Sequence, residues 1–191
     1  MEDEHRIDLL ARVARSASAP GKPLDPSKPV SILSLAAASY GSRPSEDATV
    51  PTGFDPLAVA LFEAIVEGAF LVATADGVFD DTERKMFERV VLAACGGAVP
   101  PPHISALVSD LGDQLSEDGL DRRIEAVSKT ASKPEHAREV LRIAALIAQS
   151  SDDVSDVERD VLTKLARQCG LGDNAVAEAM ADVKKALSDA G

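Results

Sequence analysis

The sequence predicts an all-α protein, and two observations carry that prediction. Hydrophobic residues make up 45% of the 191 residues, yet aromatic residues make up only 3% and there is no Trp. A core that rests on Ala, Val, Leu and Ile favours closely packed helices over a β-sandwich, which draws on aromatic and β-branched side chains. The second observation is an internal repeat, in which a helix, an acidic turn and another helix occur twice.

The two copies of the repeat are related by a constant offset. Glu83 and Glu158 lie 75 positions apart, and so do Arg84 and Arg159. Apolar positions recur at the same offset, with Ala69, Val72, Ala73, Phe87 and Val90 corresponding to Ala144, Ile147, Ala148, Leu162 and Leu165. Because the apolar scaffold recurs together with the acids, we expect two similar halves that share one core.

Residues 1–54 are predicted to hold a short helix and a linker. The stretch 5–15 places Ile7, Leu10 and Ala14 on one side of a helix, although a helix of this length is marginal in water by itself. Pro, Ser, Gly and Ala then dominate residues 16–52, which is typical of a partly disordered linker. The apolar run 30–40 within it either docks, on this chain or on a partner, or is disordered.

The folded domain is expected over residues 55–191. Asp55 is predicted to cap its first helix, with Pro56 in the first helical position. Apolar residues as far as Ala75 predict that this helix is mostly buried, with Glu63 and Glu67 on a solvated stripe. The later helices are expected over 81–94, 103–116, 117–132, 134–148, 155–168 and 173–190, with caps near Ser116 and at Asp173. This predicts a bundle of about seven helices in two pseudo-symmetric halves.

Charge and composition exclude several classes of protein. The net charge is −12 and the pI is near 4.6, whereas a nucleic-acid-binding surface needs clustered Lys and Arg. Cys95 and Cys169 are too few and too scattered for a disulfide framework or a zinc knuckle. The N-terminal residues lack the basic start and apolar stretch of a secretory signal, and no run is expected to span a membrane. We therefore expect a cytoplasmic protein.

The first acidic turn resembles half of a calcium loop. Counting back from Glu83 places Asp76 and Gly77 at the fifth and sixth positions of such a loop. Val72 and Thr74 occupy the first and third positions, where a carboxylate or amide is required. The pattern therefore does not predict a regular EF-hand.

Helix capping is the simpler interpretation of both turns. Asp80 and Ser155 are capping residues, and each is followed three positions later by Glu, at Glu83 and Glu158. Such a box satisfies amide donors that are otherwise unpaired at the start of a helix. Capping does not account for three further acids that precede the caps, namely Asp76, Asp152 and Asp153.

The acids of both turns can form one site if the two halves pack as a pair, because both turns then reach the same end of the bundle. Several carboxylates held close together repel one another unless a cation or a Lys or Arg side chain offsets them. Oxygen ligands without His or Cys indicate Ca²⁺ or Mg²⁺ rather than zinc or copper. Caps only, a divalent-cation site and a surface for a basic partner all remain open.

The sequence ADGVFDDTER at 75–84, repeated as SDDVSDVER at 151–159, resembles the TerB-like family. This family includes the tellurite-resistance protein TerB and the N-terminal domain of the membrane-anchored co-chaperone DjlA. The resemblance covers about residues 55–190. It implies an all-helical domain of two pseudo-symmetric halves, an acidic surface that is proposed to bind metal in TerB, and an association with stress response and with complexes near the membrane.

The resemblance also implies which residues form the acidic site. Carried over by position, the candidate metal-binding residues are Asp76, Asp80, Asp81, Glu83, Asp152, Asp153, Asp156 and Glu158. The second copy departs from the family pattern, since Ser151 replaces the Asp and Asp152 replaces the Gly. The resemblance therefore does not support a symmetric centre with two metal ions.

The sequence shows no catalytic arrangement. The three histidines His5, His103 and His136 match no metal or triad spacing, and the glycine pair at 96–97 lacks the Lys of a phosphate loop. We expect a noncatalytic TerB-like module that binds a divalent cation or a basic protein partner through its acidic turns. The alternative is a scaffolding or adaptor protein whose N-terminal segment recruits a partner, with the acidic turns serving only as helix caps.

Overall fold

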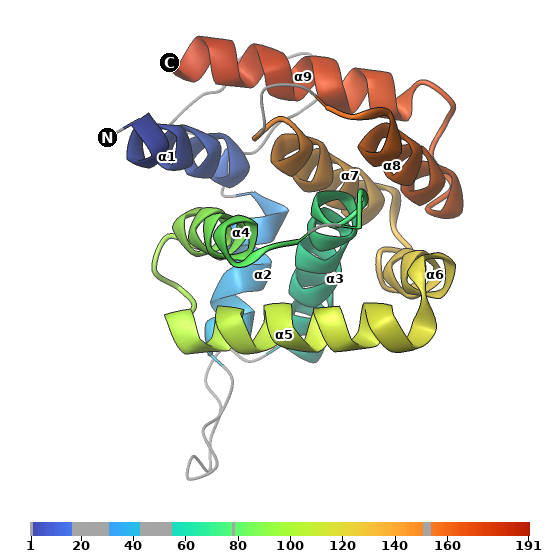
Figure 1. The fold of residues 1–191 in the computed structure, drawn as a ribbon, viewed down its shortest axis with the longest axis horizontal. Coiled ribbons are helices and arrows are strands. Elements are labelled where there is room, and N and C mark those ends of the chain that lie inside the picture. The colour runs from blue at the N-terminus through green and yellow to red at the C-terminus, as the bar shows by residue number, and fades with distance from the viewer. Residues whose placement is uncertain (1, 17–30, 43–54, 78, 151–153) are drawn as a thin grey trace, which may run out of the picture.

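Nine helices and no β-strand make up the described part of the chain, which confirms the all-α class (Figure 1). The structure is a computed structural model that describes residues 2–16, 31–42, 55–77, 79–150 and 154–191. The helices are α1 Glu2–Arg15, α2 Ile32–Gly41, α3 Pro56–Ala73, α4 Asp81–Ala94, α5 Pro101–Asp118, α6 Leu120–Thr130, α7 Pro134–Ala148, α8 Asp156–Gln168 and α9 Ala175–Ala190.

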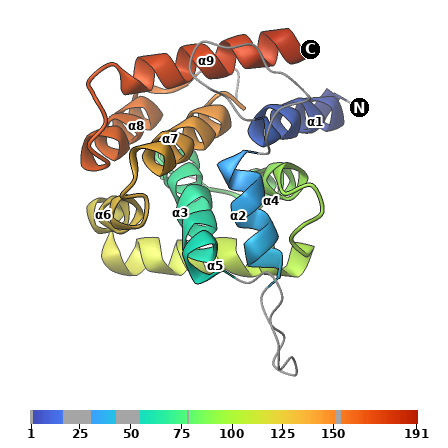
Figure 2. The same cartoon turned by 180° about the vertical axis from the view of Figure 1, so that it is seen from behind.

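The helices α3 and α7 lie at the centre of the molecule and pack against each other (Figure 1). The helix α5 crosses one end of the molecule, and α9 runs along the opposite end. Figure 2 shows from behind that α1, α2 and α4 cover one side of the central pair, while α6 and α8 cover the other. The helices α1 and α9 contact each other, and Arg12 in α1 donates through Nη1 to the carbonyl of Ala190 at 2.9 Å.

The central helix α3 starts as the sequence predicts. Asp55 Oδ1 accepts a hydrogen bond from the amide of Leu57 at 2.9 Å, and Pro56 takes the first helical position. The helix is buried along most of its length. At Gly68 it approaches α7 so closely that a Cβ would lie 2.6 Å from Val140 Cγ1. A larger residue at this position would force the two central helices apart.

The same helix has the length and hydropathy of a membrane span. It has 18 residues and a mean hydropathy of 1.9. However, 67% of α3 is buried inside the protein, and the core helix of a globular domain has the same composition. Across the described ranges, α3 is the one helix of this kind and gives no clear membrane span.

The N-terminal helices α1 and α2 contribute to the same hydrophobic core as the rest of the chain. Leu10 of α1 and Leu33 of α2 are buried, and the ring of Tyr40 packs on Phe62 of α3 with centroids 4.6 Å apart. The described part of the apolar run, residues 31–40, therefore lies almost wholly in the helix α2, which docks on this chain's own α3. The remainder of the expected linker, at 17–30 and 43–54, lies outside the described residues.

Two predicted helix caps were wrong. Ser116 lies inside α5, where its hydroxyl donates to the carbonyl of Gly112, and α5 ends instead before Gly119. Gly119 has a φ of 78°, which ends a helix because right-handed helical backbone cannot pass through the left-handed region. The helix α9 has Asn174 at the N-cap position in place of Asp173, and the Asn174 side chain makes no capping bond.

A partly buried ion pair joins α3 to α6. Arg123 Nε donates to Glu67 Oε1 at 2.6 Å, and its Nη1 donates to Asp118 at 3.0 Å. The bond to Glu67 raises the pKa of the Arg123 guanidinium above its ordinary value. The prediction that Glu67 lies on a solvated stripe was wrong, since this side chain is only 6% exposed. The sequence did not indicate its burial because its partner Arg123 lies 56 positions further along the chain.

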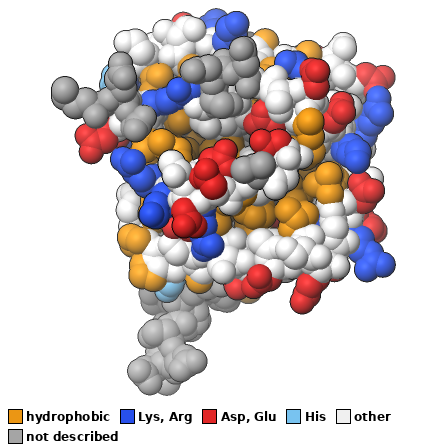
Figure 3. All heavy atoms as spheres, in the orientation of Figure 1, with side chains coloured by type: hydrophobic (Ala, Val, Ile, Leu, Met, Phe, Trp, Pro, Cys, Tyr) orange, Lys and Arg blue, Asp and Glu red, His pale blue; other side chains and the backbone are white. Residues whose placement is uncertain are grey.

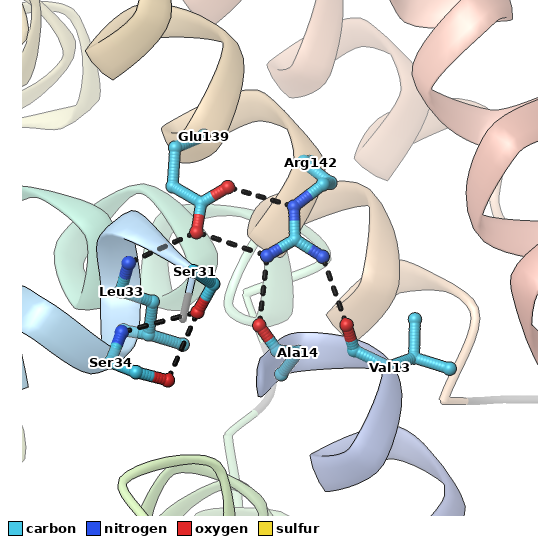
Figure 4. A network of polar contacts seen from close by, with 7 residues as sticks. All are labelled: Val13, Ala14, Ser31, Leu33, Ser34, Glu139 and Arg142. Carbon is cyan, nitrogen blue, oxygen red and sulfur yellow. Dashed lines mark hydrogen bonds and ion pairs between the residues drawn. The ribbon is translucent and has the colours of Figure 1, made fainter. Parts of the chain in front are cut away.

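A second buried pair, Glu139 and Arg142 of α7, holds the two N-terminal helices in place (Figure 4). Arg142 donates to the Glu139 carboxylate and also to the carbonyls of Val13 and Ala14, at the end of α1. Glu139 Oε1 in turn accepts from the amide of Leu33, in the first turn of α2, at 3.0 Å. The pair thus satisfies backbone groups that a helix leaves unpaired at its ends.

Candidate functional site

The two acidic turns lie around one cavity of about 470 Å³. The first turn connects α3 to α4 and the second connects α7 to α8. The described lining residues are Ala73, Asp76, Phe79, Thr82, Glu83, Met86, Phe87, Val90, Ile147, Ser150, Ser155 and Glu158. Residues from the two copies of the repeat therefore meet at a single site.

The apolar wall of the cavity is built on an aromatic cluster. Phe79 and Phe87 contact each other edge to face, with centroids 6.1 Å apart, and both also pack on Phe70. Phe87 is buried, whereas Phe79 and Met86 are half-buried and face the cavity. Edge-to-face aromatic packing fixes the position of the rings, and the unbranched Met side chain adapts to a neighbouring group.

A capping box fixes the acids of the first turn. Asp80 Oδ1 accepts hydrogen bonds from the amides of Thr82 and Glu83, at 2.7 and 2.9 Å. Glu83 Oε2 accepts from the amide of Asp80 at 3.0 Å. The predicted capping box is therefore confirmed, and these bonds satisfy amides at the start of α4.

The second turn has the same arrangement. Ser155 Oγ accepts from the amide of Glu158 at 3.2 Å, and Glu158 Oε2 accepts from the amide of Ser155 at 2.8 Å. This capping box is also confirmed. Glu83 and Glu158 are thus held at equivalent places in their turns, and both line the cavity.

The remaining predicted acids are placed less closely together. Asp76 lines the cavity, whereas Asp81 and Asp156 are exposed first residues of α4 and α8 and do not belong to the described lining. Asp152 and Asp153 lie outside the described residues. Within the ranges that the structure describes, no group of three or more His, Cys, Asp or Glu side chains could hold a metal ion.

The described lining carries three carboxylates, of Asp76, Glu83 and Glu158, and no Lys or Arg. Arg84 follows the first of these glutamates in the chain, but it pairs with Glu88 at 3.0 Å and donates to the carbonyl of Ser105 in α5. On the face that Figure 3 shows, acidic side chains lie beside exposed apolar ones. The site thus combines an apolar wall with a negatively charged rim.

The repeat in the sequence indicated the acids but not the apolar half of the site. Phe87, Val90 and Ile147 recur at the repeat offset and were interpreted as scaffold, and Met86 had no signal of its own. The described lining also includes residues from the other copy of the repeat, which a single stretch of sequence does not reveal.

The two thiols and the three histidines lie away from this lining. Burial raises the pKa of the Cys95 thiol to about 12, and burial also raises that of the Cys169 thiol. Both thiols are therefore protonated at neutral pH, which makes them poor nucleophiles and poor metal ligands.

No family model, curated protein or solved structure matches this chain. The resemblance to the TerB-like family consequently rests on the motif at 75–84 and its repeat.

Proposed function

We propose that this chain is a noncatalytic TerB-like module that binds a basic protein partner through its two acidic turns. One observation carries the proposal, namely that both turns border the same cavity, which has three carboxylates and no basic side chain in its described lining. The TerB-like motif supports a place in a cytoplasmic stress-response system such as tellurite resistance, near the membrane.

The proposal includes two pseudo-symmetric halves, which pair α3 and α4 with α7 and α8. Three features support this: each pair is joined by an acidic turn, each turn carries a capping box, and equivalent positions lie 75 residues apart. The central contact between α3 and α7 relates the two pairs to each other. On this interpretation the seven helices from α3 to α9 form the TerB-like domain, and α1 and α2 are an N-terminal addition to it.

A basic partner accounts for the acids better than a divalent cation does. A Ca²⁺ or Mg²⁺ ion needs several oxygen ligands that converge on one point, whereas the described carboxylates surround an apolar cavity. A cation site would have to recruit Asp152 and Asp153. Long Lys and Arg side chains pair with separate carboxylates and require no such convergence.

The adaptor function remains the alternative, and one observation favours it. Leu35 on α2 is 60% exposed although it is a large apolar residue, so it could contact a recruited protein. The two capping boxes would then be purely structural. Replacing Leu35 with Ser would weaken the recruitment in this case and would leave the acidic turns intact.

A variant that removes charge and keeps the caps tests the proposal. Asn suits a turn as well as Asp does, and Gln replaces Glu in a capping box. The variant Asp76→Asn/Glu83→Gln/Glu158→Gln therefore removes the three charges of the described lining, while the helix starts are retained. Its matched control removes three exposed charges from α5, in the variant Asp110→Asn/Asp113→Asn/Glu117→Gln.

We expect a Lys-rich peptide to bind the natural chain and the control variant in calorimetric titrations, and to bind the cap-preserving variant much more weakly. The binding should weaken as salt is added, because salt screens exposed charges. Equal binding to all three proteins would contradict the proposal. Mg²⁺ and Ca²⁺ are titrated separately. If either ion binds the natural chain and the control but not the cap-preserving variant, the result favours the cation alternative.

A further inference from the structure

We propose that the cavity between the two turns binds one bulky apolar side chain of the partner, such as Leu, Met or Phe, which flanking Lys or Arg residues position. This inference rests on the proposed function and specifies the partner as a basic peptide segment with an apolar anchor. The juxtaposition of an apolar wall and a charged rim in one cavity carries it.

The cavity has the size and lining of a site for an apolar group. Its volume of about 470 Å³ lies within the range of about 300–1,000 Å³ that is usual for ligand sites. Phe79 and Met86 are half-buried and Ile147 is 7% exposed, so apolar surface remains in contact with water. Covering that surface with another apolar side chain is favourable, and a purely charged peptide would leave it uncovered.

The charged rim is held in place before any partner arrives. Glu83 and Glu158 each accept a backbone hydrogen bond through Oε2, which restricts the side chain to one arrangement. When a Lys or Arg side chain of the partner pairs with such a carboxylate, less conformational entropy is lost than when it pairs with a mobile side chain. The two glutamates come from different turns and both line the cavity, which favours basic residues next to the anchor.

The negative charge of the chain favours a basic peptide segment in the cavity over a second copy of the chain or an anionic membrane surface. A second copy of the chain carries the same net charge of −12, so its approach to the acidic rim is opposed. An anionic membrane surface is repelled for the same reason. A cationic segment of another protein is attracted to the acidic rim, and its apolar residue then packs against the apolar wall of the cavity.

Two peptides that differ at one residue test the inference. Both are Lys-rich, and one carries a central Leu where the other carries Ala. We expect the Leu peptide to bind about ten to a hundred times more tightly, because the difference corresponds to the burial of most of one Leu side chain. The Ala peptide reports on the acidic rim and thus on the proposed function.

Protein variants locate the anchor. Ala73→Leu places extra atoms in the cavity and should reduce the preference for the Leu peptide by tenfold or more, whereas Ala106→Leu on the exposed face of α5 should leave it unchanged. Met86→Ala should also reduce the preference for the Leu peptide. It provides an independent test if Ala73→Leu does not fold. Circular dichroism confirms that each variant is folded.

Each outcome distinguishes the two proposals. If both peptides bind equally and with the same dependence on salt, the inference is overturned while the proposed function stands. If neither peptide binds, both proposals fail. If the preference for Leu persists in both Ala73→Leu and Met86→Ala, the anchor lies outside this cavity and the inference is again overturned.

Discussion

The buried pair of Glu139 and Arg142 offers the sharpest test of how the N-terminal helices are held on α7. Arg142 makes four hydrogen bonds, two to the Glu139 carboxylate and one each to the carbonyls of Val13 and Ala14. The variant Arg142→Met keeps most of the apolar stem of the side chain and removes all four bonds. It also leaves the carboxylate of Glu139, which is 7% exposed, without its cation.

The expected loss of stability follows from this burial. Removing one member of a buried ion pair costs about 3–5 kcal/mol, because the remaining charge is stranded away from water. Arg138→Met on the exposed face of the same helix is the matched control, and surface substitutions of this kind change stability by at most about 0.5 kcal/mol. The double variant Glu139→Gln/Arg142→Met should be more stable than Arg142→Met, since no charge is then left unpaired.

Urea unfolding followed by circular dichroism measures these differences. Cleavage of α1 and α2 by a protease at low concentration gives a second reading, because the bonds of Arg142 and Glu139 reach both helices. If Arg142→Met and Arg138→Met unfold at the same urea concentration, the pair does not hold the N-terminal helices and the reasoning fails.

Two further predictions concern a close contact and a thiol. A Cβ at Gly41 would overlap the carbonyl oxygen of Ala98, so Gly41→Ala should destabilise the chain by about 1–3 kcal/mol. At Gly112 in α5 a Cβ would lie 4.0 Å from Phe70, so Gly112→Ala should stabilise the chain by up to about 1 kcal/mol. Thermal unfolding compares the two variants, and equal effects would contradict the close approach of α2 to Ala98. Burial raises the pKa of the Cys95 thiol from 9.0 to about 12, so the folded state retains a proton that the unfolded state loses in this range, and stability falls as the pH rises. Relative to Cys95→Ala, the natural chain should lose up to about 1.4 kcal/mol for each pH unit between these two values, and parallel pH profiles of the two proteins would refute the burial of this thiol.

The parts of the fold that were predictable from sequence are those whose causes lie within a few residues. The starts of α3, α4 and α8 were placed correctly because Asp55, Asp80 and Ser155 each bond to an amide two or three positions further on. The starts of α6 and α9 were missed because Gly119 and Asn174 make no capping bond with a side chain.

The parts that were not predictable depend on contacts between distant segments. Glu67 looked like a surface acid because its partner Arg123 is remote in sequence. The run 30–40 remained ambiguous because its docking depends on Phe62 and on Glu139, more than a hundred positions beyond Leu33. Similarly, the acids of the candidate site were visible as a repeat, whereas the cavity between them forms only when the two copies meet.

A titration of the isotope-labelled chain with the Leu-containing basic peptide, followed by nuclear magnetic resonance, locates the binding site residue by residue. We expect the largest shifts from the amides of Glu83 and Glu158 and the methyl group of Met86, and no change on the exposed face of α5 around Asp110 and Asp113. Shifts that avoid the lining of the cavity, or that appear equally on α5, would contradict this expectation.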